Sequence, residues 1–183
     1  MTRGMTQKKR HRQVCIRKEW LFYGSACARK LEVQHSLEQV MHSYGFRNVQ
    51  TPTFEYFDIF NKERGTAASN EMFKFFDRGN NTLVLRPDMT PAIARCVAKY
   101  FREETEQMRF CYTAQTFVST GQYKGKLQEV TQVGAELFMD DSSDADAEML
   151  ALTIECLLES GLKEFQIEGT CRSVPGFGRG SRL

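Results

Sequence analysis

The sequence has 183 residues and lacks several features that would have assigned it to a functional class at once. It has no apolar run near the roughly 18 residues that cross a bilayer, so we expect no membrane span. No apolar block follows the basic N-terminal residues, so we expect no secretory signal. Neither a G-x-G-x-x-G motif nor a P-loop is present, and the three histidines show no nucleophile or metal arrangement.

Cysteine spacing gives a further exclusion. No C-x-x-C pair occurs, and the cysteines are scattered along the chain. This pattern argues against a zinc site and against a disulfide framework, and it favours reduced thiols in the cytoplasm. We therefore expect a cytoplasmic protein without metal or cofactor. The six cysteines are Cys15, Cys27, Cys96, Cys111, Cys156 and Cys171.

Charge is distributed very unevenly along the chain. Residues 1–18 carry seven basic side chains and no acidic one, and residues 169–183 carry three arginines and no acid. The segment between them has 15 basic and 23 acidic side chains. Basic ends on an acidic body are typical of nucleic-acid-binding arms, but they would also arise if the ends were foreign to the body. Charge alone leaves both interpretations open.

Periodicity and turn residues predict an α+β fold with an antiparallel sheet flanked by helices, and they disfavour a doubly wound parallel sheet. A content of 41% hydrophobic and 26% charged residues suits an ordinary core. Three helices are expected: one capped by Ser25 and ended by Gly45, one capped by Thr90 and running to about Phe101, and one capped by Ser143 and ended by Gly161. The expected strands are at 48–51 before Pro52, at 72–76 and 82–86 as a hairpin, at 109–118, at 129–138 and from Phe165 to Glu168. The aromatic stretch at 54–60 is expected to be a strand or a helix.

Four polar residues stand out as a candidate binding site. Gln132 and Glu136 share one face of a predicted strand, as do Gln128, Val130 and Gly134. Asp88 and Thr90 lie at a strand-to-helix junction. If the two pairs face each other, they would offer acceptors to an α-amino group, which has three N–H donors. Alternatively, Gln132 and Glu136 face solvent, and Asp88 and Thr90 only cap the helix.

Several runs resemble, in order and spacing, the catalytic core of histidyl-tRNA synthetases: Thr51–Glu55, Leu83–Thr90 and Thr131–Glu136. Further runs are similar to a paralogous family, the regulatory subunits of short-form ATP phosphoribosyltransferase: Phe57–Arg64, Phe73–Asp77 and Cys111–Thr113. The resemblance extends from about Gly24 to Glu168. It implies a partial class II aminoacyl-tRNA synthetase-like core.

The resemblance implies roles for individual residues. Asp88, Thr90, Gln132 and Glu136 match the positions that hold the histidine α-amino group in the synthetases. The second class motif of the synthetases reads Phe-Arg-x-Glu, but here the run 117–120 is Phe-Val-Ser-Thr. Val118 and Thr120 are therefore lost ATP-binding positions, because valine cannot grip a phosphate as a guanidinium does. We expect amino-acid recognition without adenylate chemistry.

The resemblance also implies a function. We expect a non-catalytic regulatory subunit that pairs with the catalytic subunit of ATP phosphoribosyltransferase, the first enzyme of histidine biosynthesis. It would form a homodimer within a hetero-oligomer, with histidine as effector. The alternatives are a divergent histidyl-tRNA synthetase and a nucleic-acid-binding module. The basic N-terminus has no aromatic residue before Trp20, which disfavours binding by stacking, and we expect no nucleic-acid partner.

The two ends do not resemble the family. We expect residues 1–20 to be an atypical basic segment without order, residues 21–168 to form the synthetase-like core, and residues 169–183 to be an atypical tail. Residues 14–20 can be encoded by codons that, when translated from two bases later, give the family-like string Leu-His-Pro-Glu-Gly-Val. Codons for residues 176–183, when translated from one base later, give Ala-Leu-Glu-Glu-Ala-Ala-Gly, which is typical of an acidic helix. We therefore expect a broken reading frame at both ends, which the nucleotide sequence would test.

Overall fold

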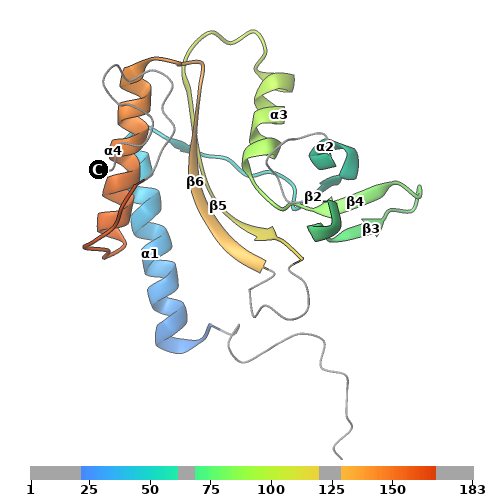
Figure 1. Ribbon diagram of the computed structural model, residues 1–183, viewed down its shortest axis with the longest axis horizontal. Helices are drawn as coiled ribbons and strands as arrows, with labels where there is room; N and C mark the ends of the chain where they lie inside the picture. The colour runs from blue at the N-terminus through green and yellow to red at the C-terminus, as the bar shows by residue number, and fades with distance from the viewer. Residues whose placement is uncertain (1–21, 62–68, 120–128, 168–183) are drawn as a thin grey trace, which may run out of the picture.

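The computed structural model describes residues 22–61, 69–119 and 129–167 (Figure 1). The expectations for residues 1–20 and 169–183, for Thr120 and for Gln128 lie outside these ranges. In chain order the described elements are α1 (Gly24–Ser43), β1 (Arg47–Asn48), β2 (Phe54–Tyr56), α2 (Phe57–Asn61), the 3-10 helix η2 (Ser69–Glu71), β3 (Lys74–Phe76), β4 (Thr82–Leu85), α3 (Thr90–Tyr100), β5 (Met108–Phe117), β6 (Glu129–Phe138) and α4 (Ser143–Glu159).

The main sheet has the strand order β1-β5-β6. Strands β5 and β6 form a long antiparallel pair whose register runs from Met108 opposite Phe138 to Phe117 opposite Glu129. Strand β1 pairs with β5 in parallel, which differs from the expected antiparallel sheet. The predicted α+β class with helices flanking the sheet is correct (Figure 1).

Side chains alternate between the two faces of the main sheet along β5 and β6, so both faces present side chains for helices to pack against. On one face, α1 and α4 pack over a core that contains Met41, Phe46, Cys111 and Leu152. On the opposite face, α3 packs over Met89, Ile93, Tyr112 and Ala114. Gln132, Gly134 and Glu136 alternate with the residues of the α1/α4 core, so they belong to the α3 face.

A second small sheet has the order β2-β4-β3, and both pairs in it are antiparallel. Its hairpin turn is the predicted one: the Asp77 N–H donates to the Asn81 carbonyl, and Asn80 has a φ of 63°. The aromatic stretch at 54–60 is both strand and helix, since β2 leads directly into α2. Phe60, Met72 and Val84 form the core of this part.

Both predicted glycine stops are confirmed. Gly45 has a φ of 81° and Gly161 a φ of 91°, a region that glycine adopts without the strain of a Cβ. At the first stop, the Gly45 N–H donates to the His42 carbonyl and the Phe46 N–H to the Met41 carbonyl. This pair of bonds satisfies carbonyls that the helix end would otherwise leave unpaired.

The helix starts were predicted less well. Helix α1 begins at Gly24, with Tyr23 at the N-cap and no side-chain cap bond, so Ser25 lies inside the helix. For α4 the cap is Ser142, one residue before the expected Ser143. Ser142 has an extended backbone and its hydroxyl accepts from the Ala145 N–H, which is the geometry of an N-cap.

Three further expectations were wrong in detail. Thr90 does not cap α3; Met89 precedes the helix, and the Thr90 hydroxyl is used elsewhere. The strand expected at 48–51 is instead Arg47–Asn48, and beyond it the Thr51 carbonyl accepts from Arg86. Residues 165–167 form no strand, and no described strand pairs with them. None of the helices in the described ranges is both long and apolar enough to cross a bilayer.

Candidate functional site

The connection from β4 to α3 is held in place by a buried arginine. Arg86 is 7% exposed, and its guanidinium donates to the carbonyls of Gln115 (2.8 Å), Thr51 (2.8 Å) and Pro52 (3.3 Å). Burial lowers the pKa of Arg86 from its ordinary value. These bonds tie the connection to β5 and to the segment before β2, which fixes the position of the residues that follow Arg86.

Asp88 and Gln132 meet across this connection. The Asp88 Oδ1 atom accepts the Met89 N–H at 2.7 Å and the Gln132 Nε2–H at 3.1 Å. The Gln132 Oε1 atom is buried and has no hydrogen-bond partner. A buried carbonyl oxygen without a donor costs free energy, so this atom is an unsatisfied acceptor in the structure.

Thr90 and Glu136 form the second contact. The Thr90 hydroxyl donates to the Glu136 Oε1 atom at 2.5 Å, and the Tyr112 hydroxyl donates to the same atom at 3.5 Å. We call Asp88, Thr90, Gln132 and Glu136 the acceptor site. The structure thus brings all four predicted residues together in two hydrogen-bonded pairs, with Asp88 and Thr90 opposite β6.

The acceptor site is electrostatically negative. Burial raises the pKa of Glu136, the nearby Asp88 charge raises it further, and hydrogen bonds from Thr90 and Tyr112 oppose the rise. Burial also raises the pKa of Tyr112 to about 12, with a contribution from the Glu136 charge. The ion pairs in the described ranges are Arg95–Glu55 and Arg109–Glu148, and neither includes Asp88 or Glu136. Two carboxylates with no basic partner among the described residues give this part of the protein a negative potential.

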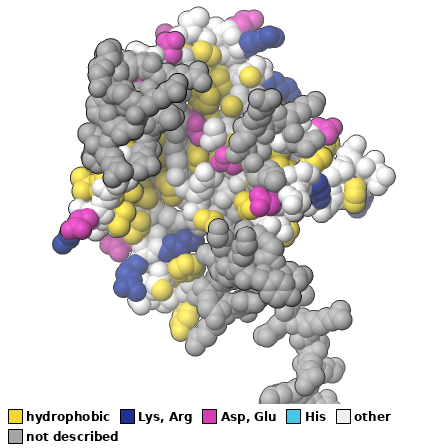
Figure 2. Space-filling view, viewed as in Figure 1, with side chains coloured by type: hydrophobic (Ala, Val, Ile, Leu, Met, Phe, Trp, Pro, Cys, Tyr) yellow, Lys and Arg dark blue, Asp and Glu magenta, His cyan; other side chains and the backbone are white. Residues whose placement is uncertain are grey.

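Figure 2 shows acidic side chains spread over the face in view, some near its middle and others toward its edges. The described residues include no group of three or more His, Cys, Asp or Glu side chains that could hold a metal ion.

Tyr112 was missed by the sequence reasoning, which assigned it no role. It lies directly opposite Gly134 in the β5–β6 pair. A Cβ atom added at Gly134 would lie 2.5 Å from the Tyr112 hydroxyl oxygen, so the tyrosine occupies the space that a side chain would need. A glycine inside a strand often marks such a close approach, and it was the signal available in the sequence.

Val118, which the resemblance led us to expect as a lost ATP-binding position, lies beside the same connection. Val118 directly follows β5 and is half-buried. The Phe117 N–H donates to the Arg86 carbonyl at 3.0 Å, which fixes this end of β5 next to the β4–α3 connection. The side chain at position 118 is uncharged and apolar, so it provides no donor for a phosphate. Thr120 lies outside the described residues.

Glu55, part of a polar run noted in the sequence, does not belong to the acceptor site. It is 9% exposed and forms an ion pair with Arg95 of α3. The Arg95 Nε atom is buried without a partner. This pair joins the second sheet to α3 and so has a structural role.

Comparison with known proteins identifies the family. The family model described as histidyl-tRNA synthetase matches residues 24–174. The chain belongs to the histidyl-tRNA synthetase family. Within that family, the curated relatives that it matches include proteins named ATP phosphoribosyltransferase regulatory subunit. One, from Clostridium novyi, is 39% identical over 78% of this chain and 34% of the relative. Another, from Bacillus pumilus, is 40% identical over 75% of this chain and 35% of the relative.

Solved structures of the histidyl-tRNA synthetase family confirm the fold. A Bacillus halodurans protein described as an ATP phosphoribosyltransferase regulatory subunit/histidyl-tRNA synthetase has a TM-score of 0.71 at 31% identity, covering 79% of this chain and 37% of that chain. Apo histidyl-tRNA synthetase from Staphylococcus aureus has a TM-score of 0.64 at 24% identity over 78% of this chain and 38% of that chain, which shows the fold alone. The expected class II-like core and the resemblance to the regulatory subunits are confirmed. The chain spans about a third of the length of the curated relatives it matches.

Proposed function

We propose that this chain is the histidine-binding core of a regulatory subunit of ATP phosphoribosyltransferase. In this proposal it performs no catalysis, binds the catalytic subunit in the cytoplasm, and supports both the first step of histidine biosynthesis and its inhibition by histidine. It does so as a homodimer within a hetero-oligomer. The names of the relatives at 39% and 40% identity support the regulatory role.

The observation that carries histidine binding is the surplus of hydrogen-bond acceptors over donors at the acceptor site. The Gln132 Oε1 atom is buried without a partner, and no described basic side chain pairs with Asp88 or Glu136. An α-ammonium group has three N–H donors and one positive charge, and it would supply what the site lacks.

The non-catalytic role is supported by position 118. Adenylation requires stabilisation of the negative charge that develops on the α-phosphate, and a bidentate arginine provides it in the synthetase pattern. Here the residue is Val118, which follows the end of β5 beside the β4–α3 connection. A chain that keeps the ammonium acceptors but loses this arginine is expected to bind the amino acid without activating it.

Two measurements test the proposal. Isothermal titration calorimetry should show histidine binding to the purified protein, and substitution of Glu136 by alanine should weaken that binding about tenfold or more, as for a hydrogen bond to a charged group. Leu158→Ala is a matched control, because Leu158 is exposed on α4. Addition of the protein to the catalytic subunit should raise its turnover and make it sensitive to histidine. Unchanged kinetics at saturating protein would refute the regulatory role, and histidine-dependent ATP–pyrophosphate exchange would favour the synthetase alternative.

A further inference from the structure

We infer that Tyr112 is a positioning residue of the acceptor site: its ring fills the space over Gly134, and its hydroxyl holds the Glu136 carboxylate beside Thr90. The inference uses the proposed function only for the identity of the ligand. The arrangement of Tyr112, Gly134 and Glu136 is a property of the protein itself.

The ring position depends on the absence of a side chain at Gly134. Tyr112 and Gly134 are register partners on the same face of the sheet. A Cβ atom at position 134 would lie 2.5 Å from the tyrosine oxygen and 2.6 Å from its Cζ atom. Gly134 does not have a positive φ, so its backbone conformation does not require glycine. The three atoms nearest to such a Cβ all belong to Tyr112, so the tyrosine side chain is what a residue with a side chain would meet first.

The ring is also fixed from the opposite side. Tyr112 is 4% exposed and belongs to a core cluster with Met89, Ile93 and Ala114. Met89 directly precedes α3 and Ile93 lies in its first turns, so the ring is enclosed between that helix and the sheet. A side chain held in this way has little rotamer freedom, and its hydroxyl therefore marks a defined point in the site.

The hydroxyl acts on one particular atom. Both Tyr112 and Thr90 donate to the Glu136 Oε1 atom, and no described residue donates to Oε2. Two donors on one oxygen restrict rotation of the carboxylate and stabilise its charged form. Glu136 also faces the negative charge of Asp88, which acts in the opposite direction. Loss of the Tyr112 hydroxyl should therefore make Glu136 easier to protonate and less well oriented.

The test compares four forms of the protein by carbon-13 NMR titration of glutamate carboxyl groups: wild type, Tyr112→Phe, Gly134→Ala and the control Tyr56→Phe. Tyr56 is 53% exposed on the second sheet, so its hydroxyl should not affect Glu136. The signal of Glu136 is assigned by its loss in Glu136→Gln. We expect the pKa of Glu136 to rise in Tyr112→Phe and to stay unchanged in Tyr56→Phe. Tyr112→Phe keeps the ring, so it should fold even if Gly134→Ala does not.

Histidine titration of the same proteins separates this inference from the proposed function. If the wild type binds histidine, Tyr112→Phe should bind it about two- to tenfold more weakly, as for loss of one hydrogen bond, with greater weakening at lower pH. If the wild type does not bind histidine but the pKa of Glu136 still rises in Tyr112→Phe, the proposed ligand is wrong and the positioning role stands. An unchanged pKa of Glu136 in Tyr112→Phe overturns the positioning role, whatever the affinity for histidine.

Discussion

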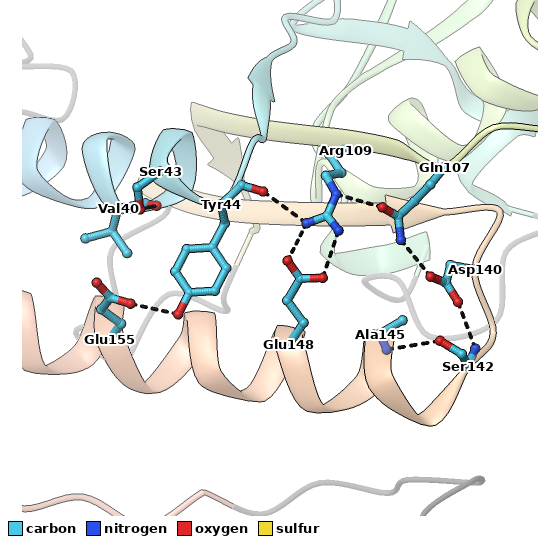
Figure 3. Close-up of polar contacts among 10 residues, drawn as sticks. All are labelled: Val40, Ser43, Tyr44, Gln107, Arg109, Asp140, Ser142, Ala145, Glu148 and Glu155. Atoms are coloured by element: carbon cyan, nitrogen blue, oxygen red, sulfur yellow. Dashed lines mark hydrogen bonds and ion pairs between the residues drawn. The ribbon is translucent and has the colours of Figure 1, made fainter.

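Arg109 on β5 and Glu148 on α4 form a two-point ion pair: Nη1 lies 2.5 Å from Oε1, and Nη2 lies 2.8 Å from Oε2 (Figure 3). The same guanidinium donates to the Tyr44 carbonyl at 3.0 Å, just after α1. One side chain thus connects the main sheet to α4 and to the end of α1, the two helices that cover one of its faces. The arrangement requires the planar fork of arginine, which a lysine cannot reproduce.

Arg109→Lys should therefore lower the free energy of unfolding by about 0.5–1.5 kcal/mol, because a single ammonium cannot bond to the carboxylate and the carbonyl together. Urea unfolding followed by circular dichroism measures the difference. Arg78→Lys is the matched control, because Arg78 is exposed in the β3–β4 turn. Equal losses in the two variants would contradict the role of the fork.

The same region predicts loss of stability in acid. The Arg109 hydrogen bond lowers the pKa of Glu148 below its ordinary 4.5, and hydrogen bonds from Ser142 lower that of Asp140 below 3.8. A folded-state pKa below the unfolded value contributes stability above the unfolded pKa, and that contribution disappears as pH falls through the folded pKa. The free energy of unfolding should fall as pH drops below about 5, and less steeply in Glu148→Gln. Parallel pH profiles for the two proteins would refute this.

The raised pKa of Glu136 predicts a loss of stability at neutral pH, opposite to the effect of Glu148 and Asp140. Its pKa is raised, so the folded state holds this proton more tightly than the unfolded state does. Above both pKa values the buried charge therefore costs stability. Glu136→Gln, whose amide oxygen still accepts from Thr90, should be more stable than the wild type at pH 7 and should lose that advantage as pH falls through the folded pKa. Thermal unfolding at pH 7 and pH 4 measures this, and a less stable variant at pH 7 would contradict it.

Val118→Arg should not restore adenylation. The arginine would reach the end of β5 beside the β4–α3 connection, but the glutamate of the synthetase pattern is still absent, because the sequence has Thr120 at its place. A guanidinium without the second charged group leaves the motif incomplete. Histidine-dependent ATP–pyrophosphate exchange is the measurement, with wild type as reference. Exchange in the variant would show that position 118 alone separates this chain from an active synthetase.

Local signals in the sequence predicted local structure well. The stops at Gly45 and Gly161, the Asp77–Asn81 turn and the alternation along β6 each depend on a few neighbouring residues. The division into two sheets and the parallel pairing of β1 depend on contacts between distant segments, which such signals do not encode. Strand periodicity and the strand-to-helix junction singled out the residues of the acceptor site, and the family resemblance pointed to the same four. The role of Arg86 depends on carbonyls far away in the sequence, and for Tyr112 the sequence offered only Gly134 as a signal of a close approach.

The three acceptors of Arg86 are all main-chain carbonyls. Replacement of the side chain at Thr51 or Gln115 leaves the carbonyl that binds the guanidinium in place. Replacement of Arg86 itself removes all three bonds at once. Positions 51 and 115 should therefore tolerate substitution, whereas position 86 should not. A library that randomises these positions and is selected for folding should recover many residues at 51 and 115, and arginine almost exclusively at 86.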